Sequence, residues 1–351
     1  MKRRLNVFFI LLFALLVVTG ILEWQSRDRR FAPKESLSEV TESVIDREKI
    51  IFSGTNPGNI PAILEPTFDT VSVADQYLTD SGLGISLTEG GQETFYPFQI
   101  LVWHEVVHDE LEGKPIVVMY SPLSGASAVF SSSTEAEDFS FEVSGRVYES
   151  SSLYQDSRTH SLWSSILGKA VGGALTDIEL VRIPVGLSTW GEWKTRHPRG
   201  RALSKRTGVT RDYTRSPYPL YDEGRTLMFP VTHRDGRLHP KEIVYGYVGP
   251  NGETKAFPRQ YLLEHGEITD SVLGRKVEIS EERGGILTAF GEDAEGERMS
   301  IVLRPMYWFA WFTIFPETEL YDPLGEAEAR NKERRSQEGT RVDLNDSNVV
   351  K

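Results

Sequence analysis

The chain has 351 residues, of which 39% are hydrophobic, 11% aromatic and 26% charged, a composition that supports a packed globular body and excludes a fibrous or wholly disordered protein. The formal net charge of -12 argues against nucleic acid as a partner, because phosphate binding needs a positive field. Cysteine is absent, which excludes disulfides, thiolate nucleophiles and cysteine-ligated metal centres.

Residues 1–24 predict a membrane anchor or signal segment. Three basic residues at positions 2–4 precede an apolar run over positions 7–22, which is at the short limit for spanning a hydrocarbon core of ~30 Å. The basic start predicts a cytoplasmic N-terminus and a body on the extracytoplasmic side of the cell membrane. Cleavage near Gly20 is the alternative and would release an exported soluble protein.

The rest of the chain divides by composition into three parts. Residues 25–59 are polar and broken by Pro and Gly, and predict a tether. Residues 60–322 predict a globular body that is mainly β (α+β) with short helices. Residues 323–351 are charged and contain no aromatic side chain, and predict a disordered tail.

Short β-rich runs bounded by Gly, Pro, Ser or Asp predict strands in the body; they are Phe139–Val147, Leu180–Pro184, Glu242–Val248, Arg275–Ile279 and Met299–Leu303. Ser188, followed by Trp190 and Trp193 and then by Pro198, predicts a short capped helix. The apolar run Met306–Phe315 is too short to span a membrane, and we expect it to be a buried strand.

An internal repeat is the most informative feature of the body. A shift of 161 residues places Gly91–Gly113 on Gly252–Gly274 without a gap, with seven identical positions among 23. In the first copy these are Gly91, Pro97, Gln99, Leu101, His104, Asp109 and Gly113. In each copy a Gly turn between two strands predicts a hairpin, and a Pro then opens a short helix. We expect related units around residues 84–130 and 244–290.

His104-Glu105-Val106-Val107-His108 spells H-E-x-x-H. On a continuous helix the two imidazoles would hold zinc and Glu105 would act as the base of a hydrolase. In the second copy, however, the position of Glu105 is Gly266, which is typical of the end of a helix. By analogy the first helix ends near His104 and residues 106–111 form a strand. We therefore predict no cofactor, and zinc on His104 and His108 remains the alternative.

A basic segment covers residues 194–215, with eight Lys or Arg against one acidic residue, Asp212. It indicates either binding to an anion or to the surface of the cell envelope, or a solvated loop that pairs with acidic side chains of the same body.

Several segments, in order, resemble an uncharacterised family catalogued as domain of unknown function 3179. They include YPFQILVWHEVVHDELEGKPIVVMYSPLSG, LSTWGEWKTRHP and WFAWFTIFPETELY. Members of that family usually read Y-C-P-L-C-G where this chain has Tyr120-Ser121-Pro122-Leu123-Ser124-Gly125. The resemblance implies an exported or membrane-anchored protein without an established activity. A family site that works through the two thiols is lost here, because serine preserves only their size and hydrogen bonding.

Together these observations predict a membrane-anchored binding or structural module rather than an enzyme. We expect its ligand site to be a polar pocket near the first copy of the repeat. The predicted ligand-binding residues are His104, Glu105, Asp109, Ser121, Ser124, Arg158 and Trp163. The membrane is the predicted partner, through the N-terminal segment, and the sequence names no ligand.

Overall fold

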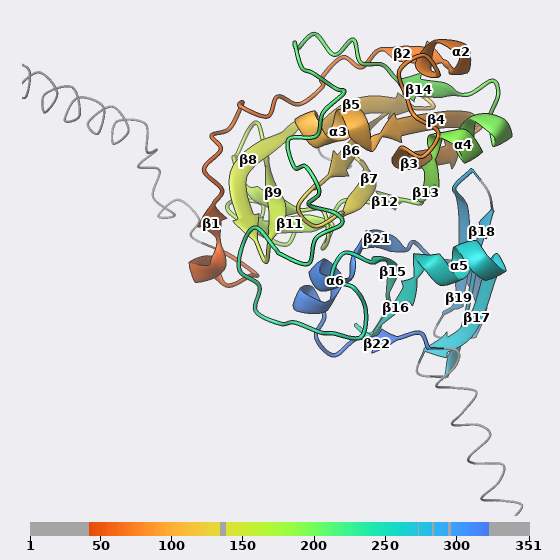
Figure 1. Cartoon of the computed structure of the whole chain (residues 1–351). Coiled ribbons are helices and arrows are strands. Elements are labelled where there is room, and N and C mark those ends of the chain that lie inside the picture. Colours follow the sequence, from red (N-terminus) through yellow and green to blue (C-terminus); the bar gives the residue numbers. More distant parts are fainter. Residues whose placement is uncertain (1–41, 134–137, 273, 283, 294–295, 323–351) are drawn as a thin grey trace, which may run out of the picture. The chain divides into compact units, whose positions relative to one another are not determined.

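The structure, a computed structural model, describes residues 42–133, 138–272, 274–282, 284–293 and 296–322 (Figure 1). Contact clustering separates Met1–Thr41 from Glu42–Lys351, and every described residue belongs to the second unit. The predicted anchor, the predicted tail and the first part of the predicted tether lie outside the described residues. Among those residues, no helix has both the length and the apolar character needed to cross a membrane.

The strands of the described residues form five sheets, the first two of which come mainly from the first half of the chain. In spatial order, sheet 1 contains β13 (Gly186–Thr189), β3 (Leu83–Glu89), β4 (Gln92–Pro97), β14 (Arg201–Leu203) and β2 (Phe68–Thr70). Sheet 2 contains β12 (Arg182–Ile183), β7 (Ser127–Ser131), β6 (Lys114–Tyr120) and β5 (Val106–Leu111).

Sheet 3 contains β1 (Ile51–Phe52), β8 (Phe141–Tyr148), β9 (Ser151–Asp156), β10 (Leu162–Ser164) and β11 (Lys169–Gly172). Sheet 4 contains β21 (Arg304–Tyr307), β15 (Ile243–Val248), β16 (Thr254–Pro258) and β22 (Glu319–Leu320). Sheet 5 contains β17 (Glu267–Val272), β18 (Arg275–Glu282), β19 (Ile286–Glu292) and β20 (Arg298–Ser300). Strand β1 lies in the segment predicted to be a tether and pairs with β8.

The helices are short. They are η2 (Arg47–Lys49), α2 (Val71–Ala74), α3 (Phe98–His104), α4 (Trp190–Arg196), α5 (Arg259–His265) and α6 (Trp308–Ile314). The mainly β fold class is thus confirmed, and four of the predicted strand regions contain β8, β12, β15 and β18. In the fifth, Met299–Leu303, only the first two residues belong to a strand, β20.

The predicted strand at Met306–Phe315 is wrong beyond its first two residues, because the chain turns into α6 after Tyr307. Trp308 and Trp311 lie one helical turn apart and are both fully buried, as is Ala310 between them. A short helix buried on most of its sides shows no amphipathic period, so its sequence cannot be told from that of a buried strand.

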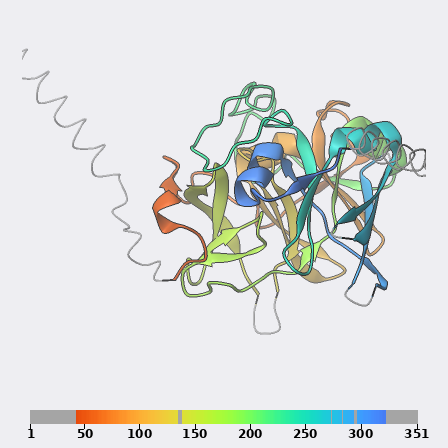
Figure 2. The same ribbon diagram turned by 90° about the horizontal axis from the view of Figure 1, so that it is seen from below.

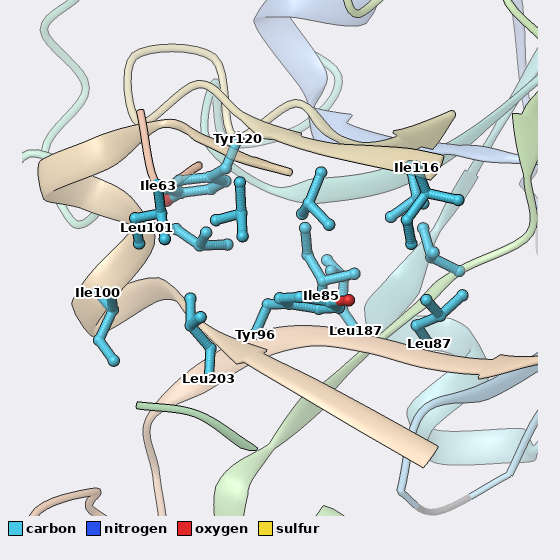
Figure 3. Packing of buried hydrophobic residues seen from close by; sticks show 14 of the residues in the cluster. Ile63, Ile85, Leu87, Tyr96, Ile100, Leu101, Ile116, Tyr120, Leu187 and Leu203 are labelled. Atoms are coloured by element: carbon cyan, nitrogen blue, oxygen red, sulfur yellow. The ribbon is translucent and has the colours of Figure 1, made fainter. Parts of the chain in front are cut away.

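The five sheets form a propeller-like ring (Figure 1). Figure 3 shows the packing between sheets 1 and 2, where Ile85 and Tyr96 face Ile116 and Tyr120 across an apolar core. A second core lies between sheets 2 and 3, and another between sheets 4 and 5. Burial of these apolar side chains is the main stabilising contribution to the ring.

Two polar contacts join the remaining neighbours in the ring. The Ser86 hydroxyl in sheet 1 donates to the Gly284 carbonyl in the turn before β19, at 3.0 Å. Arg304 in sheet 4 donates from Nη1 to the Ile166 carbonyl, in the turn between β10 and β11 of sheet 3, at 3.0 Å. Sheets 5 and 1, and sheets 4 and 3, are therefore also neighbours.

The internal repeat is present in the fold and extends beyond the predicted ranges. Sheets 1 and 4 share the strand arrangement β13-β3-β4-β14 and β21-β15-β16-β22, in which the last strand is parallel to its neighbour. In both copies the hairpin leads through a seven-residue helix, α3 or α5, into an antiparallel meander. The second strand-helix-strand also recurs, and α4 and α6 share the pattern W-x-x-W-x-T-x-x-P.

The two copies meet at a close seam. Gly186 of β13 approaches Gly285 so closely that a Cβ at position 186 would lie 2.0 Å from the Gly285 carbonyl oxygen. Beside this contact Arg259 of α5, only 7% exposed, donates to the Leu187 carbonyl at 2.6 Å and to Glu281 at 2.9 Å. The seam thus contains a buried ion pair that is also hydrogen-bonded to the backbone of the other copy.

Candidate functional site

The H-E-x-x-H sequence is not on one helix. Helix α3 ends at His104, Glu105 adopts the left-handed conformation with φ of 58°, and β5 begins at Val106. In the second copy α5 ends at His265 and Gly266 has φ of 80°. The prediction that the two helices end at the same position is confirmed. The continuous helix that a zinc site with Glu105 as base requires is therefore absent here.

Each of the two histidines has partners of its own. The His104 ring donates from Nδ1 to the Pro61 carbonyl at 2.7 Å, and its Nε2 accepts from the Tyr213 hydroxyl at 2.7 Å. Nε2 of His108, a half-buried side chain, accepts from the Phe141 backbone N–H at 3.1 Å. Burial lowers the pKa of both rings, so both are neutral at pH 7. Their bonds are those of structural histidines.

Glu105 has the unusual environment. Its side chain is buried, with the residue 2% exposed, and Oε2 has no hydrogen-bond partner among the described residues. Burial raises its pKa to about 7, and the nearby Ser152 hydroxyl offsets part of the rise. The residue lines a cavity of about 320 Å³. A buried carboxyl group that has an unpartnered oxygen and belongs to a cavity-lining residue is a candidate for ligand binding.

Hydrogen-bonded serine side chains form a cluster that contacts Glu105 through Ser152. Ser121 donates to the Ser152 hydroxyl at 3.1 Å and accepts from the Ser152 backbone N–H at 3.1 Å. The Ser124 and Ser151 hydroxyls are 2.8 Å apart. These four residues are buried, and they join the turn after β6 to the start of β9. Of the predicted ligand-binding residues, only Glu105 lines the cavity, while Ser121 contacts Ser152, which also lines it, and Ser124 contacts Ser151.

The other predicted residues lie elsewhere. Asp109, near the far end of β5, accepts from the Tyr96 hydroxyl at 2.6 Å and from Arg201 at 2.9 Å. Trp163 donates from its indole N–H to Asp156 at 3.1 Å, and the Arg158 backbone N–H donates to the same carboxylate. His104 is directed to Pro61 and Tyr213. These contacts are internal to the body and do not line the cavity at Glu105.

The long covering segment, residues 204–242, connects β14 of the first copy of the repeat to β15 of the second. All of it is described, it contains neither helix nor strand, and Figure 2 shows it as a run of loops along one side of the body. Lys241 holds part of it together, because its buried ammonium group donates to the carbonyls of Tyr221, Gly224 and Thr226. Tyr221 in turn donates to the Leu123 carbonyl at 2.9 Å.

Four parts of the chain build the cavity, one of which is the segment before β2, with Ser53, Thr55 and Ile60. Glu105 and Leu123 come from the first copy of the repeat, Val143 and Ser152 from the inserted sheet 3, and Tyr218, Met228 and Phe229 from the covering segment. Tyr218 lies close enough to Glu105 for the carboxylate to contribute, after burial, to raising the tyrosine pKa to about 12. Sequence reasoning missed Ser152, Tyr218 and Phe229. The length of the irregular segment was the one available signal.

The charges of the basic segment are largely neutralised within the body. Lys194 pairs with Asp75 and Asp80, the latter at 2.7 Å, and the other ion pairs are Arg196–Glu282, Arg201–Asp109, Arg206–Asp69 and Arg215–Asp212. The pairing agrees with the interpretation of residues 194–215 as a segment that contacts acidic side chains of the same body. In the part of the chain that the structure describes, no group of three or more His, Cys, Asp or Glu side chains could hold a metal ion.

Comparison with known proteins gives one match. A family model described as "Protein of unknown function (DUF3179)" matches residues 57–303, which include both copies of the hairpin, the cavity at Glu105 and the covering segment. Neither a curated protein nor a solved structure matches.

Proposed function

The chain belongs to the DUF3179 family of proteins of unknown function, and from that premise we propose that it is a ligand-binding module whose site is the cavity at Glu105. The observation that carries the proposal is the buried Glu105 carboxyl group, whose residue lines the cavity and whose Oε2 has no partner among the described residues. Natural proteins rarely leave such a group unsatisfied unless it serves a ligand.

The comparison between the two copies supports a functional reason for this carboxyl group. A non-glycine residue in the left-handed conformation costs about 1–2 kcal/mol, and the second copy avoids this cost with Gly266. The first copy instead has a glutamate, and buries it. Strain combined with a buried, incompletely bonded charge is typical of a site selected for binding rather than for stability.

The features that distinguish the first copy from the second also converge on the cavity. They are Glu105 in place of glycine and the inserted sheet 3, and the covering segment that links the two copies lines the cavity as well. The parts of the fold that the copies share pack the cores instead. Binding sites are commonly placed on such additions to a rigid scaffold.

The chemistry of the lining indicates the class of ligand. Val143, Val147 and Phe229 provide apolar walls, and Glu105 and Arg146 are the charged residues of the lining. We propose a small ligand that carries an apolar part and an N–H or O–H donor, with a protonated amine the best donor, because a charge-assisted bond to a carboxylate is the strongest available. The serine hydroxyls are bonded to one another, so we propose binding rather than catalysis.

For the location, we propose a single-pass membrane protein with this module on the extracytoplasmic side, or an exported soluble protein if cleavage occurs near Gly20. The basic residues at positions 2–4 and the apolar run that follows support this. Alkaline extraction of membranes tests the anchor, and N-terminal sequencing of the mature protein tests cleavage. Recovery of an intact chain in the cytoplasmic fraction would contradict both versions.

The experiment that tests the binding function is mass spectrometry of small molecules released from the purified protein. Glu105→Gln keeps the size of the side chain and removes its charge, and we expect it to lose the bound molecule. Glu112→Gln is the matched control, because Glu112 also has a positive φ, 52°, but is exposed on the turn after β5. Equal loss in both variants, or retention in both, would contradict the proposal.

A further inference from the structure

We propose that a second site, the groove between α3, β6 and the covering segment, binds a saccharide without net charge. The groove has a volume of about 590 Å³, within the range of natural ligand sites. It shares only Tyr218 with the cavity at Glu105. This inference does not depend on the Glu105 cavity binding a ligand.

Aromatic side chains dominate the groove. Phe98 lies stacked on Tyr120, with ring centroids 4.2 Å apart. The tyrosines that line it are Tyr77, Tyr120, Tyr213, Tyr218, Tyr221 and Tyr307. A tyrosine combines an apolar ring face with a polar hydroxyl group, which matches a sugar ring with its C–H face and its hydroxyl groups.

The hydroxyl groups of these tyrosines fall into two sets. Those of Tyr77, Tyr213 and Tyr221 are bonded to the protein. Those of Tyr120 and Tyr307 have no hydrogen bond to any described residue, although the two residues are only 5% and 8% exposed. Two hydroxyl groups that line one groove therefore have no partner among the described residues and are available to a ligand.

The charged side chains of the groove favour a neutral polar ligand over an anion, a cation or a purely apolar molecule. Asp222 and Arg215 both line the groove, so neither an anion nor a cation meets a uniform field. A purely apolar ligand would cover the Tyr120 and Tyr307 hydroxyl groups without giving them a hydrogen-bond partner, which is unfavourable. A saccharide satisfies both conditions, because its hydroxyl groups donate to carboxylates, accept from guanidinium groups and do either with tyrosines.

The rim of the groove carries a strained, exposed residue. Leu220 has φ of 58°, which is unfavourable for leucine, and is 71% exposed. Backbone strain often occurs at functional sites, and the exposed side chain is available as an apolar contact for a ligand. Leu220 lies two residues from Asp222, and both line the groove, so the rim offers an apolar contact beside a hydrogen-bonding group.

The test is isothermal titration of residues 42–351, or of the detergent-solubilised full chain, with tetrasaccharides of glucose, galactose, mannose and N-acetylglucosamine. We expect at least one of them to bind, and binding to weaken tenfold or more in both Tyr120→Phe and Tyr307→Phe, which remove one hydroxyl group each. Tyr154→Phe is the control, because Tyr154 is fully buried between sheets 2 and 3 and does not line the groove.

Glu105→Gln separates this inference from the proposed function, since it should leave saccharide binding unchanged while affecting the other cavity. The inference is overturned if none of the four saccharides binds to the folded protein at millimolar concentration. It is also overturned if binding is unaffected in both groove variants, or if a proline-rich peptide titrated under the same conditions binds in a way that depends on Tyr307 and the sugars do not.

Discussion

Glu105 and Gly266 occupy the same position in the two copies of the repeat, at the left-handed residue that ends α3 and α5, with φ of 58° and 80°. The backbone N–H of each donates to the carbonyl four residues earlier, at 2.7 Å in both cases. The same left-handed position is thus occupied by glycine in the second copy, which adopts this conformation without strain, and by glutamate in the first copy, which does not.

Replacing Glu105 by glycine should therefore stabilise the protein. The variant relieves the left-handed strain and removes a buried carboxyl group, and these gains exceed the greater entropy of glycine in the unfolded chain. We expect the free energy of unfolding to rise by about 1 kcal/mol in urea denaturation. Gly266→Ala is the mirror control, because its Cβ would meet no atom within 4 Å and only backbone strain is added, at a cost of about 1 kcal/mol. A loss of stability in Glu105→Gly would contradict the strain argument.

Stability should also depend on pH through Glu105. Its pKa is raised from 4.5 to about 7 by burial, so the folded protein favours the protonated carboxyl group. The resulting contribution of Glu105 to the free energy of unfolding is fully present below pH 4.5 and is lost as the pH rises through 7. The Glu105→Gln variant lacks this loss and should be the more stable protein above pH 7, by on the order of 3 kcal/mol. Denaturation curves at several pH values measure the difference, and a constant offset between the two proteins would rule out this titration.

Asp109 and Asp270 occupy the same position in the two copies, and we expect the aspartate of the second copy to contribute more to the free energy of unfolding. Asp270 pairs with Lys255 at 2.6 Å, and both side chains are 5% exposed. Asp270→Ala removes the nearer of two carboxylates that pair with the buried Lys255, the other being Glu319 at 3.4 Å, and should cost about 3 kcal/mol. Asp109→Ala should cost less, because Arg201 is more exposed.

Asp177→Ala serves as the surface comparison for these two variants. Asp177 pairs with Lys169 at 2.7 Å but is 63% exposed, so its removal should change the unfolding free energy by less than about 1 kcal/mol. Thermal or urea denaturation ranks the three proteins, and equal costs for all three would contradict the dependence on burial.

Lys241→Met should loosen the covering segment without unfolding the body. The ammonium group is the shared donor to three carbonyls of residues 221–226 and lies 3.6 Å from the centre of the Tyr221 ring. Methionine keeps the apolar stem and removes the donors. We expect faster hydrogen exchange and faster proteolysis within residues 204–242, while the amides of sheets 2 and 5 keep their protection. Uniform loss of protection across the body would mean that the lysine supports the whole fold instead.

The sequence predicted the parts of the fold that repeat. The pairing of His104 with His265 and of Glu105 with Gly266 was enough to place the end of α3 and the start of β5, because a helix end has a local chemical signature. Helix α6 was missed because the local pattern of Trp308 and its neighbours is that of any buried segment. Its relation to α4, through the two shared tryptophans and a proline, was a usable signal that a comparison at a different shift would have revealed.

The site was only half predictable for a related reason. Glu105, Ser121 and Ser124 lie within 20 residues of one another in the sequence. That short separation was the basis for predicting them as parts of one site. Ser152, Tyr218 and Phe229 reach the cavity from segments tens of residues away, and no periodicity links these positions. Arg158 and Asp109 have polar side chains that suit a ligand site, yet tertiary packing places Asp109 against Tyr96 and Arg201.

The seam at Gly186 and Arg259 makes the two halves of the body mutually dependent. A fragment that ended before residue 243 would expose the Leu187 carbonyl to water. A fragment that began at residue 243 would expose the Arg259–Glu281 ion pair, which the first half now buries. Neither half is then a free evolutionary unit. A change that disrupts the seam should therefore destabilise both halves of the body.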